Sequence, residues 1–242
     1  MVQNNGTRVP ALKPIYDAVE HHDFRALLKY SAEKFSDDKA FIIKEGKDES
    51  GKTIYKNVTY RDFERDVNDF GEGMVKRGMT GKRIAIIGKN SYPWYMTYFA
   101  TMCGLGISVP LDKGLPYEEL ENSLIKSKAD CLIFDKEHKD LADRLKKEKS
   151  TSVKTFISMN DEDGYEALSE IMIEGRKALD SGEVGFEAIE TDPEDVQVLL
   201  FTSGTTSKAK AVMLSQKNIL SDIYMLDSCE DIRRGDVNMA FL

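Results

Sequence analysis

A dense run of hydroxyl side chains beside two lysines is the part of the sequence with the clearest chemistry. Residues 202–208 read Thr-Ser-Gly-Thr-Thr-Ser-Lys, and Lys210 follows two positions later. Hydroxyl groups, free backbone N–H groups and ammonium groups are the donors that hold a polyphosphate in a loop. Apolar runs at 199–201 and 212–214 predict a strand on each side of the loop. The simpler alternative is a serine- and threonine-rich turn between two strands, because these residues favour turns by local hydrogen bonding.

The Walker A phosphate loop, G-x-x-x-x-G-K-[ST], is the first pattern to compare. When it is aligned on Gly204, its second glycine falls on Ala209, its lysine on Lys210 and its hydroxyl residue on Ala211. Two required positions therefore fail, including the hydroxyl that would hold magnesium. Nor does the sequence predict a long amphipathic helix opening at the lysine, as that motif requires. The pattern argues against a Walker-type nucleotidase.

The same run resembles the phosphate-binding signature of the AMP-forming acyl-adenylating enzymes: acyl-CoA synthetases, luciferases and peptide-synthetase adenylation domains. Their pattern reads roughly T-S-G-T-T-G-x-P-K-G-V-x-L-S-H-x-N, and this chain matches most of it through Asn218. It departs from the pattern at four positions, which are Ser207 for glycine, Ala209 for proline, Ala211 for glycine and Gln216 for histidine. A serine in place of glycine costs about 1 kcal/mol if the position needs a positive φ, and losing the proline frees the loop. Neither change removes a hydroxyl or the lysine, so we interpret the run as a variant loop that still holds phosphate.

The composition excludes several classes of protein. A net charge of −8 over 242 residues argues against nucleic acid or an anionic membrane surface as the main partner. The three cysteines are scattered without a C-x-x-C spacing, which supports neither a disulfide framework nor a zinc site. The three histidines lie in polar contexts, and we expect them to be exposed. Without a signal peptide or an apolar run of membrane length, we expect a cytoplasmic protein with no integral membrane segment, peripheral membrane contact being left open.

Strand and helix patterns alternate along the chain. A helix is predicted from Asp23 to Phe35, a hairpin from 40–43 with 53–58, and a helix that opens at Thr59 with a variant capping box. Further strands are predicted at 84–87, 107–110, 131–134 and 153–157, and further helices at 92–102, 116–128 and 138–149. The aromatic residues of 92–102 could form a cofactor or acyl site, but packing of a helix against a sheet is the simpler interpretation. The alternation predicts an α/β fold, a layered and mostly parallel sheet flanked by helices.

The resemblance extends over this organisation, from about residue 23 to the end. The segments that carry it are Thr59-Tyr60, Arg83-Ile84-Ala85-Ile86, Asn90-Ser91, Trp94 and Val109-Pro110-Leu111-Asp112, which look like the first subdomain of these enzymes. An acidic, glycine-containing stretch at 181–194 is a candidate linker. We therefore predict an N-terminal α/β subdomain over 1–190 and the start of a second subdomain, carrying the loop, over 191–242. The wording from Phe201 to Met213 most resembles bacterial long-chain fatty acid–CoA ligases.

The C-terminal residues 239–242 are apolar and predict the start of a buried strand. Enzymes of this family are considerably longer and carry an adenine-binding segment, a ribose-binding aspartate, a hinge and a C-terminal catalytic lysine. The resemblance therefore implies an N-terminal fragment, incomplete for catalysis by itself. A homodimer is left open, and we expect small-molecule substrates and no nucleic acid among the partners.

The resemblance implies an AMP-forming carboxylate–thiol ligase. A carboxylic acid, in the first place a long-chain fatty acid, attacks the α-phosphate of ATP to give acyl-AMP and pyrophosphate, and coenzyme A then displaces AMP. Lys210 is the candidate catalytic residue at the β- and γ-phosphates. The candidate nucleotide-binding residues are Thr202, Ser203, Gly204, Thr205, Thr206, Ser207, Lys208 and Lys210. Magnesium would bridge phosphate oxygens, and no residue of this chain is assigned as its ligand. The alternatives are a ligase that loads a carrier protein or activates an aromatic or amino acid, and a non-catalytic nucleotide-binding module.

Overall fold

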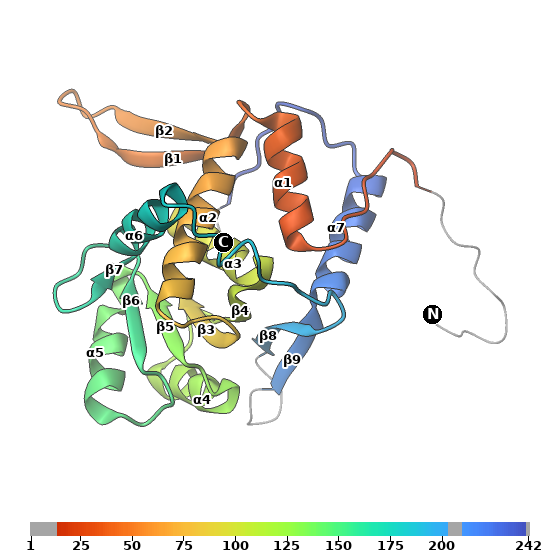
Figure 1. The fold of residues 1–242 in the computed structure, drawn as a ribbon. Coiled ribbons are helices and arrows are strands. Elements are labelled where there is room, and N and C mark those ends of the chain that lie inside the picture. The colour runs from red at the N-terminus through yellow and green to blue at the C-terminus, as the bar shows by residue number, and fades with distance from the viewer. Residues whose placement is uncertain (1–13, 203–209, 241–242) are drawn as a thin grey trace, which may run out of the picture.

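The sheet at the centre of the molecule has seven strands in the order β7-β6-β5-β3-β4-β8-β9 (Figure 1). The computed structural model describes residues 14–202 and 210–240. The strands are β3 (Lys82–Ile87), β4 (Gly106–Pro110), β5 (Cys131–Phe134), β6 (Thr155–Ser158), β7 (Glu166–Ala167), β8 (Val196–Thr202) and β9 (Lys210–Ser215). All neighbours pair in parallel except β8 and β9, which are antiparallel. The predicted α/β fold with a mostly parallel sheet is confirmed.

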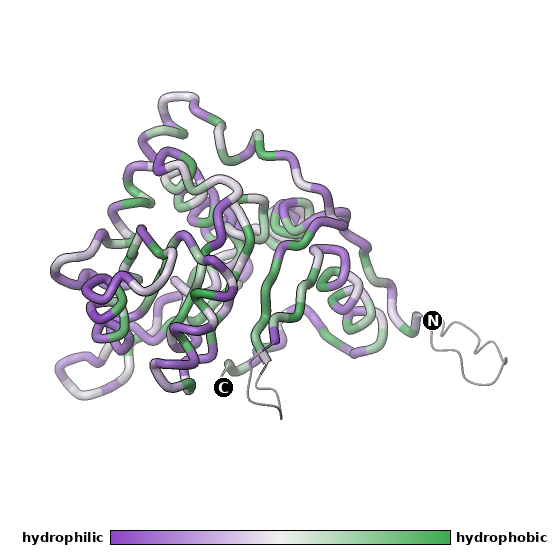
Figure 2. Tube along the Cα trace, turned by 90° about the horizontal axis from the view of Figure 1, so that it is seen from below, coloured by the Kyte–Doolittle hydropathy of each residue, from purple (hydrophilic) through white to green (hydrophobic). Residues whose placement is uncertain are grey.

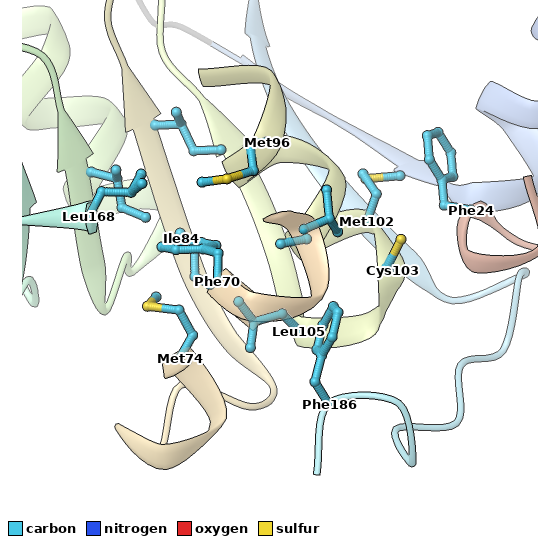
Figure 3. Packing of buried hydrophobic residues seen from close by; sticks show 14 of the residues in the cluster. Phe24, Phe70, Met74, Ile84, Met96, Met102, Cys103, Leu105, Leu168 and Phe186 are labelled. Atoms are coloured by element: carbon cyan, nitrogen blue, oxygen red, sulfur yellow. The ribbon is translucent and has the colours of Figure 1, made fainter. Parts of the chain in front are cut away.

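Helices cover both faces of this sheet. Among the helices that pack with the first hydrophobic cluster are α2 (Tyr60–Lys76), α3 (Tyr92–Ala100) and α6 (Leu168–Asp180), and those of the second are α4 (Tyr117–Ser127) and α5 (Lys139–Glu148). In β3, Ile84 and Ile86 belong to the first cluster, whereas Ala85 and Ile87 belong to the second. A strand buried on both faces needs apolar residues throughout, which is why the run at 84–87 shows no alternation. Figure 3 shows the first cluster, with Phe70 and Met74 of α2 lying against Ile84.

The N-terminal elements lie beside the sheet and follow their local signals. Helix α1 (Phe24–Phe35) begins where Asp23 Oδ1 accepts the Ala26 N–H at 2.7 Å. Strands β1 (Lys39–Lys47) and β2 (Thr53–Thr59) form a separate antiparallel hairpin. The side chains of Thr59 and Asp62 then form the predicted capping box of α2, with Asp62 N–H donating to Thr59 Oγ1 at 3.1 Å. All three predicted elements are confirmed.

The aromatic helix α3 packs into the core, as the simpler interpretation expected. Trp94 stacks on Tyr98 with ring centroids 5.4 Å apart, and Phe99 meets Phe63 of α2 edge-on at 5.0 Å. The helix continues differently from the prediction, because residues Thr101–Leu105 form a π-helical turn η1 instead of more α-helix. Gly104, at φ 106°, ends this turn and leads the chain into β4.

The structure adds elements that the sequence patterns did not single out. Helix α6 crosses α2 closely, and α7 (Gln216–Cys229) follows β9. The expectation of a strand at the C-terminus is wrong within the described residues: 238–240 have no regular structure, and Met239 is 76 % exposed. A strand needs a neighbour to accept its backbone hydrogen bonds, and no described strand lies beside this segment. No helix in the described part of the chain is long and apolar enough to cross a bilayer.

Candidate nucleotide-binding hairpin

The hydroxyl-rich run connects the two antiparallel strands β8 and β9, as its apolar flanks predicted. The register pairs Thr202 with Lys210, Phe201 with Ala211 and Leu200 with Val212. Figure 2 shows hydrophobic residues along the chain that leads to this connection. The predicted site residues Ser203, Gly204, Thr205, Thr206, Ser207 and Lys208 lie outside the described residues. Thr202 and Lys210 are the two predicted site residues whose positions the structure gives.

Thr202 and Lys210 lie on the same face of the hairpin. Directly paired residues of an antiparallel ladder project their side chains to one side, with Cβ atoms about 5 Å apart. Both residues are exposed, and they are the last pair before residues 203–209. A hydroxyl donor and an ammonium group therefore lie side by side at the end of the hairpin where residues 203–209 connect its two strands. This pair can donate to neighbouring oxygens of one polyphosphate chain.

The hairpin leaves the sheet at the carboxyl ends of the parallel strands. Strand β8 is parallel to β4, with Val198 paired to Ser108, so the chain after Thr202 emerges on the same edge as the loops that follow β3, β4 and β5. Ligands of open α/β sheets bind at this edge, because loops and free backbone groups gather there. The topology thus gives the hydroxyl-rich run a location suited to a ligand.

A hydrogen-bonded pair on this edge was not found from the sequence. Asp135, the first residue after β5, lies 2.6 Å from His138 Nδ1 through Oδ1 and accepts the Lys89 N–H at 2.9 Å through Oδ2. The expectation that all three histidines are exposed is therefore wrong for His138, whose side chain is 13 % exposed, and for His21, which is half-buried; His22 is exposed. A polar context in sequence does not prevent burial when a carboxylate pairs with the ring. The available signal was the spacing: an aspartate directly after a buried strand, with histidine three residues later.

These hydrogen bonds control the charge of Asp135. Burial raises the pKa of its carboxyl group, but the hydrogen bonds from His138, the Lys89 N–H and the Glu137 N–H, together with the charge of His138, lower it by more. The net pKa lies below the ordinary value, so the carboxylate is ionised at neutral pH and holds the loop after β3 against the loop after β5. We therefore assign Asp135 and His138 a structural role, which is to fix the loops at this edge of the sheet.

The last matched residues of the family pattern, Ser215 and Asn218, have a structural role. Ser215 is the N-cap of α7: its Oγ accepts the Asn218 N–H at 3.3 Å, and Asn218 Oδ1 accepts the Ser215 N–H at 3.0 Å. This capping box accounts for the serine and asparagine at the end of the matched pattern. Gln216, one of the four departures, is fully buried as the first residue of α7.

Within residues 14–202 and 210–240, no group of three or more histidine, cysteine, aspartate or glutamate side chains could hold a metal ion. Cys103 and Cys131 are buried free thiols, and burial raises the pKa of Cys103 to about 12. Such a thiol is not ionised at neutral pH and is no nucleophile.

The sequence profile described as AMP-binding enzyme matches residues 28–242, and the chain belongs to this family.

Relatives and solved structures agree with the family. Fatty acyl-CoA synthetase A of Dictyostelium discoideum is 25 % identical over 228 residues, which are 88 % of this chain and 33 % of the relative. Long-chain-fatty-acid–CoA ligase 5 of Rattus norvegicus is 26 % identical over 180 residues, 70 % of this chain and 26 % of the relative. In four of the curated relatives, this chain spans 28 % to 38 % of the relative's length.

Two solved structures share the fold at low sequence identity. A long-chain-fatty-acid-CoA ligase from Archaeoglobus fulgidus superposes with a TM-score of 0.70 at 22 % identity, covering 89 % of this chain and 40 % of that one. The A-PCP didomain of a carboxylic acid reductase from Segniliparus rugosus, in complex with AMP, gives 0.68 at 17 % identity, covering 83 % and 32 %. At these identities the likeness shows the fold alone.

Proposed function

We propose that this chain contributes the triphosphate-binding loop of an ATP-dependent acyl-CoA synthetase. The reaction joins a carboxylic acid, in the first place a long-chain fatty acid, to AMP with release of pyrophosphate and then passes the acyl group to coenzyme A. Membership of the AMP-binding enzyme family supports the adenylating step. The acyl chain and the thiol acceptor are supported by the names of relatives at about a quarter sequence identity.

The observation that carries the proposal is the pairing of Thr202 with Lys210 across an antiparallel hairpin at the carboxyl edge of a parallel sheet. Carboxylate and triphosphate are both anions, so bringing them together requires positive charge and fixed donors. Lys210 supplies the charge at the β- and γ-phosphates. Thr202, Ser203, Thr205 and Thr206 supply hydroxyl and amide donors, and Gly204 lets the backbone approach closely.

Two further residues and one ion complete the proposed site. Ser207 adds a hydroxyl donor and Lys208 adds a supporting charge. Magnesium, when bound between phosphate oxygens, would neutralise part of their negative charge.

The predicted division of the chain remains a proposal as well. We propose that 1–190 forms one subdomain and 191–242 begins another. What supports it is the short attachment of β8 to β4, a single register position at Ser108 and Val198. Cytoplasmic location and a homodimer stay predictions.

Two readings of the site compete with a fatty acid–CoA ligase. One is a ligase that loads a carrier protein or activates an aromatic or amino acid, a reading favoured by the fold shared with an adenylation domain joined to a carrier domain. The other is a nucleotide-binding module without catalysis, which is supported by the four departures from the family pattern, at Ser207, Ala209, Ala211 and Gln216.

ATP–pyrophosphate exchange separates these readings. The chain is incubated with magnesium, ATP and labelled pyrophosphate together with a panel of fatty, aromatic and amino acids, and MgATP binding is measured in parallel by calorimetry. Exchange with fatty acids supports the proposal, and exchange restricted to aromatic or amino acids selects the first alternative. MgATP binding without exchange fits both a ligase fragment that is incomplete for catalysis and the non-catalytic module, and the same panel applied to the full-length enzyme then separates the two. Absence of MgATP binding contradicts the phosphate-loop assignment itself.

A further inference from the structure

Two buried glutamines form a hydrogen-bonded bridge at the base of the β8–β9 hairpin. Gln216 is 0 % exposed and Gln197 is 7 % exposed. Gln216 Oε1 accepts the Phe24 N–H at 2.8 Å, and its Nε2 donates to Gln197 Oε1 at 3.4 Å. Gln197 Nε2 in turn donates to the carbonyl oxygens of Thr101, at 3.1 Å, and of Gly106. We call this chain of contacts the glutamine bridge.

The glutamine bridge joins five elements, of which only η1 and β4 are consecutive in the chain. Phe24 is the first residue of α1, and Gln216 is the first residue of α7. Gln197 lies in β8, and the two carbonyl groups mark the start of η1 and the start of β4. Both side chains use their oxygen as an acceptor and their nitrogen as a donor. A buried amide left without these partners is costly, so each glutamine depends on the other elements staying in place.

The hairpin needs such a bridge because the sheet holds it weakly. Strands β3 and β4 pair along their whole lengths, from Lys82 with Gly106 to Ile86 with Pro110. Strand β8 pairs with β4 only at Val198 with Ser108. From Leu200 onward only Phe201 packs against the core, at the second cluster, whereas Leu200 and Thr202 are exposed, so the core contacts the outer half of the strand through one side chain. The glutamine bridge therefore fixes the orientation of the β8–β9 hairpin, which one paired position with β4 does not fix by itself.

We propose that Gln216 and Gln197 are positioning residues that set the orientation of the β8–β9 hairpin and thereby aim Thr202 and Lys210 at the triphosphate. The aiming part rests on the function proposed above. Glutamine is suited to this place because one uncharged side chain offers an acceptor to Phe24 N–H and a donor to Gln197. A neutral histidine, the residue of the family pattern at this position, also offers one acceptor and one donor. The departure at Gln216 therefore keeps the bonding capacity of the site.

Amide hydrogen exchange tests the bridge without reference to activity. The 242-residue chain is compared with Gln216→Leu, Gln197→Leu, the double variant and Gln216→His at pH 8, where an ordinary imidazole is neutral. We expect Gln216→Leu to speed exchange in 196–202 and 210–215 by about tenfold, the effect of losing one buried hydrogen bond, while α5 exchanges at its original rate. In the double variant, the hairpin amides should exchange no faster than in the faster-exchanging single variant, because both changes break the same bridge.

Two comparisons separate a local effect of breaking the glutamine bridge from a general loss of stability. Leu145 is a buried residue of α5 in the second hydrophobic cluster. Leu145→Ala should lower the free energy of unfolding without speeding amide exchange in the hairpin. Gln216→His should exchange more slowly than Gln216→Leu in both segments. Unchanged hairpin exchange in Gln216→Leu, equal loosening of α5, or a histidine variant as loose as the leucine variant would each overturn the bridge.

MgATP affinity tests the aiming. We expect Gln216→Leu to raise the Kd for MgATP about tenfold although Thr202 and Lys210 are intact, and Leu145→Ala to leave it unchanged. A loosened hairpin with unchanged Kd overturns the positioning role. If the parent chain does not bind MgATP, the proposed function fails, and hydrogen exchange still decides whether the bridge orients the hairpin.

Discussion

At the scale of single residues, the exposed pair Thr202 and Lys210 carries the proposed chemistry. Lys210 is the better probe, because its charge can be removed without disturbing the core. We expect Lys210→Ala to weaken MgATP binding by at least about tenfold, the effect of losing one charge-assisted hydrogen bond. Calorimetric titration of both proteins measures this change. Adenylation, where it can be assayed, should slow by at least about tenfold with the thermal unfolding temperature unchanged.

The matched control for this variant is Lys56→Ala. Lys56 is likewise an exposed lysine on an antiparallel strand, β2, in the hairpin outside the seven-stranded sheet. The Lys56→Ala variant should bind MgATP with the affinity of the parent chain. Equal affinities of the Lys210→Ala variant and the parent would show that Lys210 is not a phosphate ligand.

Asp135 makes a second prediction at this scale. Because its folded-state pKa is lowered, the ionised carboxylate stabilises the fold above the unfolded-state pKa of about 3.9. That contribution is lost as the pH falls through the lower, folded-state pKa. Asp135→Asn should therefore reduce the free energy of unfolding at pH 7 by about 1 kcal/mol. The difference from the parent should shrink as the pH falls below about 4.

Urea denaturation between pH 3 and pH 7 measures this difference. Asp163→Asn is the control, since Asp163 is exposed, and it should stay within about 0.5 kcal/mol of the parent throughout. A difference for Asp135→Asn that is constant over this pH range would mean that the charge of Asp135 does not stabilise the fold.

At the scale of elements, α2 and α6 cross with their backbones in contact. A methyl group on Gly175 of α6 would lie 1.8 Å from the Asp69 carbonyl oxygen and 2.7 Å from the Gly73 nitrogen, both in α2. The helices must separate to admit it, although alanine favours the helix itself. We expect Gly175→Ala to lower the free energy of unfolding by about 1–3 kcal/mol, as overpacking does. Chemical denaturation gives the value.

The control for this crossing is Gly46→Ala. Gly46 lies in β1 with no atom within 4 Å of an added Cβ. This substitution should change stability by less than about 1 kcal/mol. If the two variants unfold at the same denaturant concentration, the close crossing of α2 and α6 does not contribute to stability in solution.

At the scale of the whole molecule, apolar surface gathers at one side. β9 is the edge strand of the sheet, and Met213 on it is 66 % exposed. Other exposed apolar residues on β8, β9 and α7 are Val196, Leu200, Val212, Ile223, Met225 and Leu226. An edge strand with exposed apolar side chains associates with further strands. The chain should therefore form oligomers at high concentration, and Met213→Lys should reduce them.

Sedimentation velocity over a concentration series checks this expectation. Ile173→Lys is the control, because Ile173 is exposed on α6, among the helices at the other end of the sheet order. It should leave the association unchanged. A chain that stays monomeric throughout the series, or that associates equally in the Met213→Lys variant, would show that this surface is not adhesive.

The local features of the fold could be predicted because their causes lie within a few residues. Asp23 and Thr59 cap their helices through N–H groups three positions away, and the apolar run at 84–87 reports burial on both faces of one strand. The hydroxyl-rich run between two apolar flanks likewise predicted a loop between strands, and the structure pairs those strands. The π-helical turn after α3 escaped prediction, because Gly104 inside an apolar run marks a break without specifying its geometry.

The amino-acid sequence by itself therefore determined the class of fold, the capped helices and the hairpin that presents Thr202 and Lys210. Only the tertiary structure decided that β8 lies beside β4, that Asp135 meets His138 and the Lys89 N–H, and that Gln216 reaches Phe24. Phe24 and Gln216 lie 192 positions apart in the chain. The physical reason is that periodicity and capping act over one or two turns, whereas many strand orders satisfy the same apolar pattern. Close packing of both hydrophobic clusters selects among them.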